Sequence, residues 1–298
     1  MKRLPVRSGT RKRGIFSGLC LAGVLLFLFL SATAVRAGQA LRVDARSAMM
    51  VEVTTGRVLF GQDVEKPIQP ASLTKILSLY LAYEALQEGR IRKADKVTIS
   101  RKAWRTDGSK MFLEAGKEVT LDEIIKGMAV LSANDAAVAL AEHLGGDVER
   151  FADGMNATAL QLGMSESRFM NPHGLPAKGQ ISTARDLMKL ARAYIRRFPD
   201  ALGIHAMQIY SYNGIAQKNR NRLLGRCPGV DGLKTGFVCE AGYHIIVTAR
   251  RGDRRLVAVV LGARNPRIRE REAARLIEAG FIMLKGKGAP PVEVKGRK

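Results

Sequence analysis

The sequence contains little cysteine, little histidine and comparatively little negative charge. Its 298 residues include three Cys and four His, and none of these has the spacing of a metal-binding motif. Only 27 Asp and Glu accompany 49 Lys and Arg, so the formal net charge is +22. No zinc-finger, basic-zipper or aromatic single-strand motif accompanies this charge. These absences argue against a metal centre and against a nucleic-acid partner.

A long hydrophobic run lies close to the N-terminus. Six Lys and Arg within residues 2–13 precede the apolar stretch 15–35, and the small-residue sequence VRAG follows. This order is typical of a secretory signal, so we expect a signal peptide over residues 1–37, cleaved after Ala37 or Ala34. The alternative is an uncleaved N-terminal membrane anchor. Either way we expect an exported protein of the periplasm or cell envelope, with an association to the inner membrane left open.

The positive charge remains after removal of the signal peptide. The rest of the chain has 42 basic and 27 acidic residues, a net charge of +15. Such an excess attracts polyanions, which for an exported protein would be anionic cell-wall polymers or membrane lipids. A cationic surface that only keeps the protein soluble is the alternative. Two of the cysteines, Cys227 and Cys239, lie in this part, and both a disulfide and free thiols remain open.

Hydrophobic periodicity predicts strands at both ends of the chain and helices between them. Two strands about a Thr-Gly turn are expected over residues 47–60, and a second hairpin turns at Gly252-Asp253. Helical spacing is found at 70–89, 120–130, the segment ending at Gly146, 148–162, 183–198 and 266–284. The helix at 70–89 is apolar almost all round and should be buried. The pattern predicts an α+β fold, in which one sheet from both chain ends is covered by a helical subdomain.

A serine and a lysine stand three positions apart at the head of the helix at 70–89. On a helix Ser72 and Lys75 share a face, and a serine in the first turn has a free backbone N–H. Lysine is a useful base only if its pKa is lowered by about three units, which burial and a neighbouring cation can do. The buried helix supplies the first of these conditions, and Lys234 could supply the second. Ser72 and Lys75 are therefore a candidate nucleophile and base.

Two further short motifs follow in the order of a known series. Ser132 and Asn134 form an S-x-N element, and residues 234–236 read Lys-Thr-Gly. The series S-x-x-K, S-x-N and K-T-G is typical of serine acyl-enzymes that act on penicillin and on D-Ala-D-Ala peptides.

Between about residues 42 and 285 the sequence resembles the low-molecular-mass penicillin-binding proteins of the D-alanyl-D-alanine carboxypeptidase type, serine peptidase family S11. The likeness extends to stretches such as PASLTK, FMNPHGL, NRNRLL and DGLKTGF. It implies a β-lactamase/DD-peptidase-like fold, in which an antiparallel sheet is covered by helices with an inserted helical subdomain. It also implies a catalytic domain over residues 38–285. The composition of residues 286–298 predicts a basic, disordered tail.

The resemblance also implies roles for individual residues, without metal or cofactor. Ser72 would be acylated, with Lys75 as its base; Ser132 would relay protons, and Asn134 would bind the substrate carbonyl. Lys234 would add positive field, Thr235 would hold the terminal carboxylate, and Gly236 would leave room for the substrate. The N–H groups of Ser72 and Phe237 would form the oxyanion hole. Arg269 would grip the carboxylate of the terminal D-alanine.

Two other candidate motifs are interpreted as structural. A second S-x-N at Ser211 and Asn213 lies in a segment with the pattern of a strand and loop, whereas the motif belongs between two helices. His173, in NPHGL, could be a conventional base, but its Pro-His-Gly context is typical of a shaping loop.

The activity implied by the resemblance is removal of the terminal D-alanine from peptidoglycan pentapeptides, with β-lactams as acylating inhibitors. A D-alanyl-D-alanine endopeptidase that cuts cross-links has the same motifs and remains the alternative. A β-lactamase is disfavoured, because the Glu-x-x-Leu-Asn pattern of its commonest class is missing after Asn134. The sequence also lacks the additional modules of many transpeptidases. An inactive wall-binding protein is disfavoured because every motif residue is intact.

Overall fold

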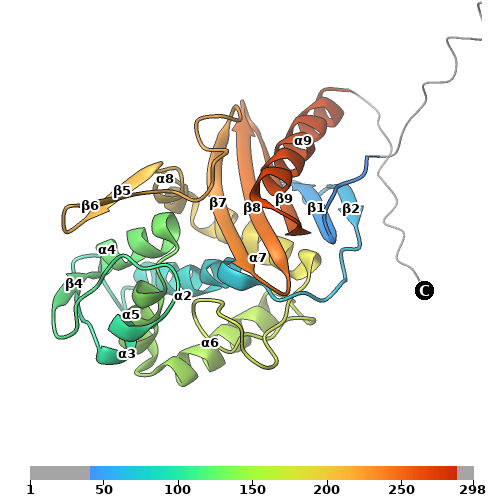
Figure 1. Ribbon diagram of the computed structural model, residues 1–298. Helices are drawn as coiled ribbons and strands as arrows, with labels where there is room; N and C mark the ends of the chain where they lie inside the picture. The colour runs from blue at the N-terminus through green and yellow to red at the C-terminus, as the bar shows by residue number, and fades with distance from the viewer. Residues whose placement is uncertain (1–40, 287–298) are drawn as a thin grey trace, which may run out of the picture. The chain divides into compact units, whose positions relative to one another are not determined.

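The computed structural model describes residues 41–286, and the compact unit that contains the candidate site begins at Val43. The predicted signal peptide, and the predicted tail beyond Gly286, lie outside the described residues. A five-stranded antiparallel sheet forms one part of this unit, in the order β2-β1-β9-β8-β7 (Figure 1). Its strands are β1 (Ser47–Glu52), β2 (Val58–Gln62), β7 (Val230–Val238), β8 (Gly242–Arg251) and β9 (Arg254–Ala263).

The sheet combines strands from both ends of the described chain, as the pattern of strand-rich ends predicts. The β1–β2 hairpin forms one edge, and β1 pairs with β9 through six consecutive residue pairs from Ser47–Leu261 to Glu52–Leu256. The β8–β9 hairpin turns at Gly252-Asp253 as expected. Strand β7, which carries Lys-Thr-Gly, forms the opposite edge and is therefore accessible to a ligand along one side.

Helices cover both faces of the sheet. Helix α9 (Pro266–Lys285) packs on one face, where Gly280 lies so close to Met50 and Leu256 that a Cβ would meet their side chains at 2.6–2.7 Å. Helix α7 (Ala184–Arg197) lies against β1 and β9 from the other face (Figure 1). This layered arrangement confirms the predicted α+β class.

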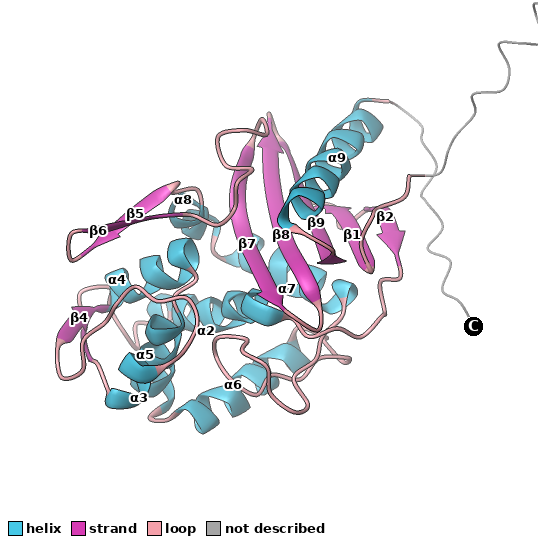
Figure 2. Cartoon of the chain, in the orientation of Figure 1, coloured by secondary structure: helices cyan, strands magenta, loops and turns pink. Residues whose placement is uncertain are grey.

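The helical subdomain lies beside β7 (Figure 2). Its central helix, α2 (Lys75–Gln87), is buried nearly all round, as its apolar sequence predicts. A capping box between Thr120 and Glu123 starts α4, which continues directly into a π-helical turn. The other elements between β2 and β7 are the 3₁₀ turn η1 (Ala71–Thr74), β3 (Lys96–Thr98), α3 (Arg101–Arg105), β4 (Glu118–Thr120), α4 (Leu121–Lys126), the π-helix η2 (Gly127–Leu131), α5 (Asn134–Gly145), α6 (Val148–Gln161), η3 (Pro199–Ala201), α8 (Leu202–His205), β5 (Ile209–Tyr212) and β6 (Ile215–Lys218).

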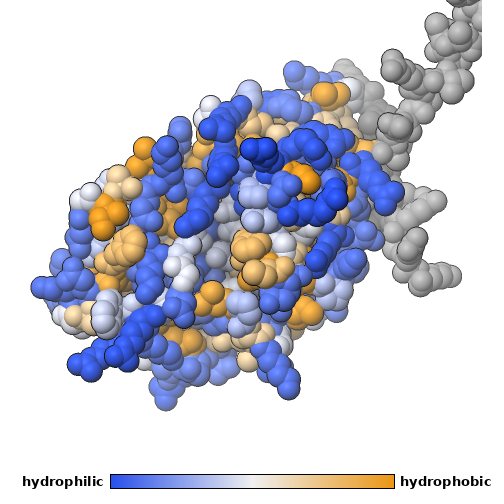
Figure 3. Space-filling view, viewed as in Figure 1, coloured by the Kyte–Doolittle hydropathy of each residue, from blue (hydrophilic) through white to orange (hydrophobic). Residues whose placement is uncertain are grey.

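The face that Figure 3 presents is largely hydrophilic, and its hydrophobic side chains lie in small separate patches. Every helix among residues 41–286 is too short or too polar to cross a lipid bilayer.

Candidate active site

Ser72 lies in a short 3₁₀ turn rather than in the continuous α-helix that the periodicity predicts. The turn η1 spans Ala71–Thr74, and α2 begins at Lys75. Residues three apart eclipse each other in a 3₁₀ helix, so this turn brings the lysine amine close to the serine hydroxyl. The distance from Lys75 Nζ to Ser72 Oγ is 3.2 Å. Ala71 has a φ of 49°, a left-handed conformation that is uncommon for a residue with a Cβ.

The Lys75 side chain is fully buried, and its amine lies among three oxygens. Besides Ser72 Oγ, Nζ is 2.6 Å from Asn134 Oδ1 and 2.7 Å from the His173 carbonyl oxygen. Burial lowers the pKa of Lys75 well below its usual range, and the positive charge of Lys234 lowers it further, against the opposing effect of Asp135. The two conditions for a lysine base that the sequence suggests, burial and a neighbouring cation, are both present.

Asn134 and Ser132 enter the site from the junction between η2 and α5. Ser132 ends the π-helix with a left-handed φ of 63° and is buried. The Asn134 side chain accepts from Lys75, as above, and donates from Nδ2 to the Asp107 carbonyl oxygen at 2.6 Å. The neighbouring Asp135 carboxylate accepts from the backbone N–H groups of residues 111–113 at 3.0–3.1 Å. These bonds fix the loop at 107–113 against the start of α5.

Strand β7 brings Lys234 and Thr235 to the opposite wall of the site. Both are buried, and Lys234 Nζ donates to the Thr235 carbonyl oxygen at 3.0 Å. Burial lowers the pKa of Lys234 to about 7, with smaller effects from the charges of Arg220 and Arg269. Lys234 is therefore a cation whose charge depends on pH near neutrality.

The structure provides an additional reason for glycine at position 236. A Cβ there would lie 3.1 Å from Ala71 Cβ and 3.2 Å from the backbone nitrogen of Ser72. Glycine thus lets β7 pass directly beside the turn that carries the serine, besides the predicted room for a substrate. Phe237, whose N–H is predicted to complete the oxyanion hole, has a half-exposed ring stacked on Tyr243 at a centroid distance of 4.3 Å.

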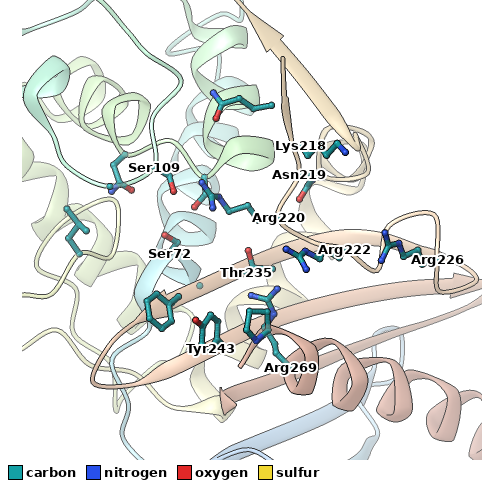
Figure 4. Close-up of a pocket in the computed structure, with 18 residues that line it drawn as sticks. Ser72, Ser109, Lys218, Asn219, Arg220, Arg222, Arg226, Thr235, Tyr243 and Arg269 are labelled. Atoms are coloured by element: carbon teal, nitrogen blue, oxygen red, sulfur yellow. The ribbon is translucent and has the colours of Figure 1, made fainter. Parts of the chain in front are cut away.

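Arg269 belongs to the same site although α9 lies far away in the sequence (Figure 4). Its side chain is buried, Nη2 donates to Glu270 Oε1 at 2.6 Å, and Nε has no hydrogen-bond partner among the described residues. Burial lowers the pKa of Arg269. The guanidinium still stays charged at neutral pH, because the usual pKa of arginine is very high. The guanidinium therefore has capacity for a further acceptor.

A cavity of about 950 Å³ joins these groups. Seven of the nine predicted site residues line this cavity. Lys234 lies on β7, the strand that lines it. Lys75 lies beneath the cavity, hydrogen-bonded to Ser72 and Asn134. The cavity is lined by Ser72, Gly108, Ser109, Ser132, Asn134, Leu175, Gln217, Lys218, Asn219, Arg220, Arg222, Arg226, Thr235, Gly236, Phe237, Tyr243, Pro266 and Arg269.

Several lining residues are absent from the predicted site. Four of them are cations: Lys218 ends β6, and Arg220, Arg222 and Arg226 lie between β6 and β7. Figure 4 shows Arg222 beside Thr235. The alternation Asn219-Arg220-Asn221-Arg222 in the sequence could have indicated them, since alternate residues of an extended segment face opposite sides. In the sequence analysis, the stretch NRNRLL that contains these residues supported the family resemblance, but none of its residues was assigned a role in the site.

The structure also places the two motifs that the sequence interprets as structural. Ser211 and Tyr212 lie on β5, and Asn213 follows in its hairpin turn with a φ of 47°. His173 Nδ1 accepts a hydrogen bond from the Leu175 N–H at 3.1 Å. Burial lowers the pKa of the His173 imidazole to about 3, and the charge of Lys75 makes a smaller contribution in the same direction. The contribution of His173 to the site is thus its backbone carbonyl.

The two cysteines are free thiols in the structure. Cys227 is buried, with Sγ 3.9 Å from Glu278 Oε1, whereas Cys239 is exposed between β7 and β8. Within residues 41–286 no three His, Cys, Asp or Glu side chains gather in a way that could hold a metal ion.

The chain is similar to known proteins in sequence and in structure. The model of the peptidase S11 family, D-alanyl-D-alanine carboxypeptidase, matches residues 33–265. The carboxypeptidase DacC of Escherichia coli K12 is 39% identical over 282 residues, which cover 91% of this chain and 70% of DacC. The carboxypeptidase DacF of Bacillus subtilis is 37% identical over 269 residues, covering 88% of this chain and 69% of DacF.

Among solved structures, penicillin-binding protein 5 of Haemophilus influenzae aligns with a TM-score of 0.80 at 36% identity. The alignment covers 82% of this chain and 73% of that one. The likeness includes both the sheet and the helical subdomain, and it confirms the predicted DD-peptidase-like fold. The chain belongs to the D-alanyl-D-alanine carboxypeptidase family of serine peptidases, S11.

Proposed function

We propose that this chain is a serine-type D-Ala-D-Ala carboxypeptidase, which releases the terminal D-alanine from peptidoglycan stem pentapeptides and is acylated by β-lactams. The observation that carries the proposal is the environment of the Lys75 amine. A neutral amine has two N–H donors and one lone pair. Asn134 Oδ1 and the His173 carbonyl oxygen can only accept, so they take the two N–H groups. The lone pair is then left for the hydroxyl proton of Ser72.

In the proposed reaction Ser72 Oγ attacks the carbonyl carbon of the scissile D-Ala-D-Ala bond as its proton passes to Lys75. The N–H groups of Ser72 and Phe237 would stabilise the oxyanion, a contribution worth about 3–4 kcal/mol for one donor. Collapse of the tetrahedral intermediate breaks the C–N bond, and the leaving amine receives the proton from Lys75 through Ser132. Water then attacks the acyl-enzyme while Lys75 takes its proton. Breakage of the bond between the acyl carbon and Ser72 Oγ releases the shortened peptide, and Lys75 returns the proton to Ser72 Oγ.

A free C-terminal carboxylate would bind beside this machinery at Thr235, Lys234 and Arg269. The Arg269 guanidinium has an unpartnered Nε within the described residues, and charge-assisted bonds to a carboxylate are stronger than neutral ones. A β-lactam that carries a carboxylate would occupy the same groups. In support, the penicillin-binding protein D2 of Listeria monocytogenes, a structural relative at 32% identity and a TM-score of 0.75, has been solved in an ampicillin-bound form.

Export is a second part of the proposal. We propose a signal peptide or N-terminal anchor at residues 1–37, a catalytic domain at 38–285 and a basic tail at 286–298, in a protein of the periplasm. The net charge of +15 beyond residue 37 would favour an anionic wall or membrane surface as a neighbour.

The first test supplies the protein with a stem pentapeptide and with a cross-linked stem-peptide dimer in parallel. We expect free D-alanine from the pentapeptide and an intact dimer, because the cavity offers cations to a free terminal carboxylate. Quantification of D-alanine and mass spectrometry of the peptides measure both products. Cleavage of the dimer at a comparable rate would instead support the endopeptidase reading.

The activity should also depend on pH on both sides of neutrality. Lys75 must be neutral to accept a proton, so kcat/KM should fall as the pH drops below its lowered pKa. Lys234 loses its charge as the pH rises through about 7, so the substrate carboxylate should bind more weakly above that pH. We therefore expect an alkaline limb near pH 7 that appears mainly in KM. Lys234→Gln should remove this limb along with much of the activity, and an unchanged limb in that variant would contradict the assignment.

A further inference from the structure

The segment at 219–222 holds two arginines on an anchored backbone at the edge of the cavity. Asn219 Nδ2 donates to the carbonyl oxygens of His205 and Met207 at 3.2 and 2.9 Å. Asn221 is buried, and its Nδ2 donates to the Gly232 carbonyl oxygen at 3.1 Å. The two asparagines also bond to each other, from Asn221 N to Asn219 Oδ1 at 2.9 Å.

Because the asparagines face the protein, the arginines that alternate with them face the cavity. Arg220 and Arg222 are exposed and both line it. Figure 4 shows Arg222 beside Thr235 and close to Arg269. In agreement, the charge of Arg222 contributes to lowering the pKa of Arg269, after the larger effect of burial. Three chain segments therefore converge at one point of the site: the 219–222 segment, β7 and α9.

The charges at this point are not balanced by the protein. Arg269 is paired with Glu270 at 2.6 Å, so that pair has little net charge. Within residues 41–286 no carboxylate forms an ion pair with Arg222. Lys234, whose pKa is about 7, contributes only part of a charge at neutral pH. Arg220 and Arg222 therefore both line the cavity as cations without a carboxylate partner among the described residues. Of the two, Arg222 is the one that lies beside Thr235 and whose charge acts on Arg269, whereas the charge of Arg220 acts on Lys75 and Lys234.

From this geometry we infer that Arg222 is a specificity residue, whose guanidinium binds the C-terminal carboxylate of the leaving residue together with Arg269 and Thr235. The inference rests on the proposed carboxypeptidase function and deepens it. A carboxylate has two oxygens and about four acceptor sites, so two guanidiniums and one hydroxyl can bind it at once. An anion at this point also relieves the repulsion between Arg222 and Arg269. The enzyme should therefore discriminate strongly against substrates whose C-terminus is neutral.

The test uses two N-acylated tripeptides that end in D-Ala-D-Ala, one with a free carboxylate and one with a C-terminal carboxamide. We expect Arg222→Gln to lower kcat/KM for the free acid about 10-fold, mainly through KM, as for loss of a charge-assisted hydrogen bond. The value for the carboxamide should stay unchanged. Arg222→Lys should recover part of the loss, because it restores the charge but not the bidentate geometry.

Arg267→Gln is the matched control, because Arg267 is an exposed arginine of α9 that lies two residues from Arg269 and does not line the cavity. It removes the same charge from the protein and should keep the kinetics of the unmodified enzyme for both peptides. An equal loss for acid and carboxamide in Arg222→Gln, or no loss for either, would overturn the inference while leaving the proposed function intact. An unmodified protein that releases no D-alanine would overturn the proposed function and this inference together.

Discussion

Ser72→Ala is expected to abolish covalent modification of the protein by benzylpenicillin. In the unmodified protein we expect one adduct by intact mass spectrometry, with the mass of one added drug molecule. The alanine variant has no oxygen at the position that lies 3.2 Å from Lys75 Nζ, so no acyl bond can form. Release of D-alanine should fall by roughly 10⁴-fold or more, the scale seen when a nucleophile is removed from an active site that works as a unit.

The control for this experiment is Ser211→Ala, which removes the serine of the second S-x-N. Ser211 is exposed on β5, and the variant should form the adduct at the same rate as the unmodified protein. A persistent adduct in Ser72→Ala would contradict the choice of nucleophile. Loss of the adduct in Ser211→Ala would contradict the structural interpretation of the second motif.

Local patterns in the sequence predicted much of this fold. The apolar spacing of α2 and the Gly252-Asp253 turn each depend on residues close together in the chain. The β3–β4 pair and α3 were not predicted, since three-residue strands and a five-residue helix are too short to show a period. The 3₁₀ turn before α2 was missed for the same reason.

The site shows a similar division between local motifs and contacts made only on folding. The three motifs identified Ser72, Lys75, Asn134 and Lys234 as site residues, and the structure brings them together at one cavity or in its walls. The carbonyl of His173 gave no signal, because any residue has one and only the fold brings it within 2.7 Å of Lys75. Arg222 was also missed as a neighbour of Arg269, since only folding brings the two residues to the same cavity.

The loop that carries His173 is held against the serine by a glycine, and this contact leads to the second large prediction. Gly174 has a φ of 87°, and a Cβ on it would lie 1.8 Å from the Ala71 carbonyl oxygen. Its N–H donates to Asn171 Oδ1 at 2.7 Å. A side chain at Gly174 would therefore push directly against the backbone of η1, one residue before the nucleophile.

Gly174→Ala should accordingly damage acylation as well as stability. The new methyl group meets backbone rather than a mobile side-chain end, so the loop or η1 must move. Either movement separates Lys75 from the His173 carbonyl or from Ser72, and misplacement of about 1 Å can cost 10²-fold in rate. We expect acylation by benzylpenicillin to slow at least ~100-fold, and the free energy of unfolding to fall by roughly 3–5 kcal/mol. Stopped-flow acylation and denaturant unfolding measure the two effects.

Gly179→Ala separates the steric contact from the cost of the left-handed backbone. Gly179 lies in the same loop with the same φ of 87°, but a Cβ there would meet only Met170 Sδ, at 3.8 Å. This variant should lose about 1–2 kcal/mol of stability from its φ alone and keep its rate of acylation. If both variants acylate at the same rate, the contact between Gly174 and Ala71 does not position the serine. In that case η1 and α2 alone would hold Ser72 in its reactive position, because displacement of Ala71 by the new methyl group would not have moved Ser72.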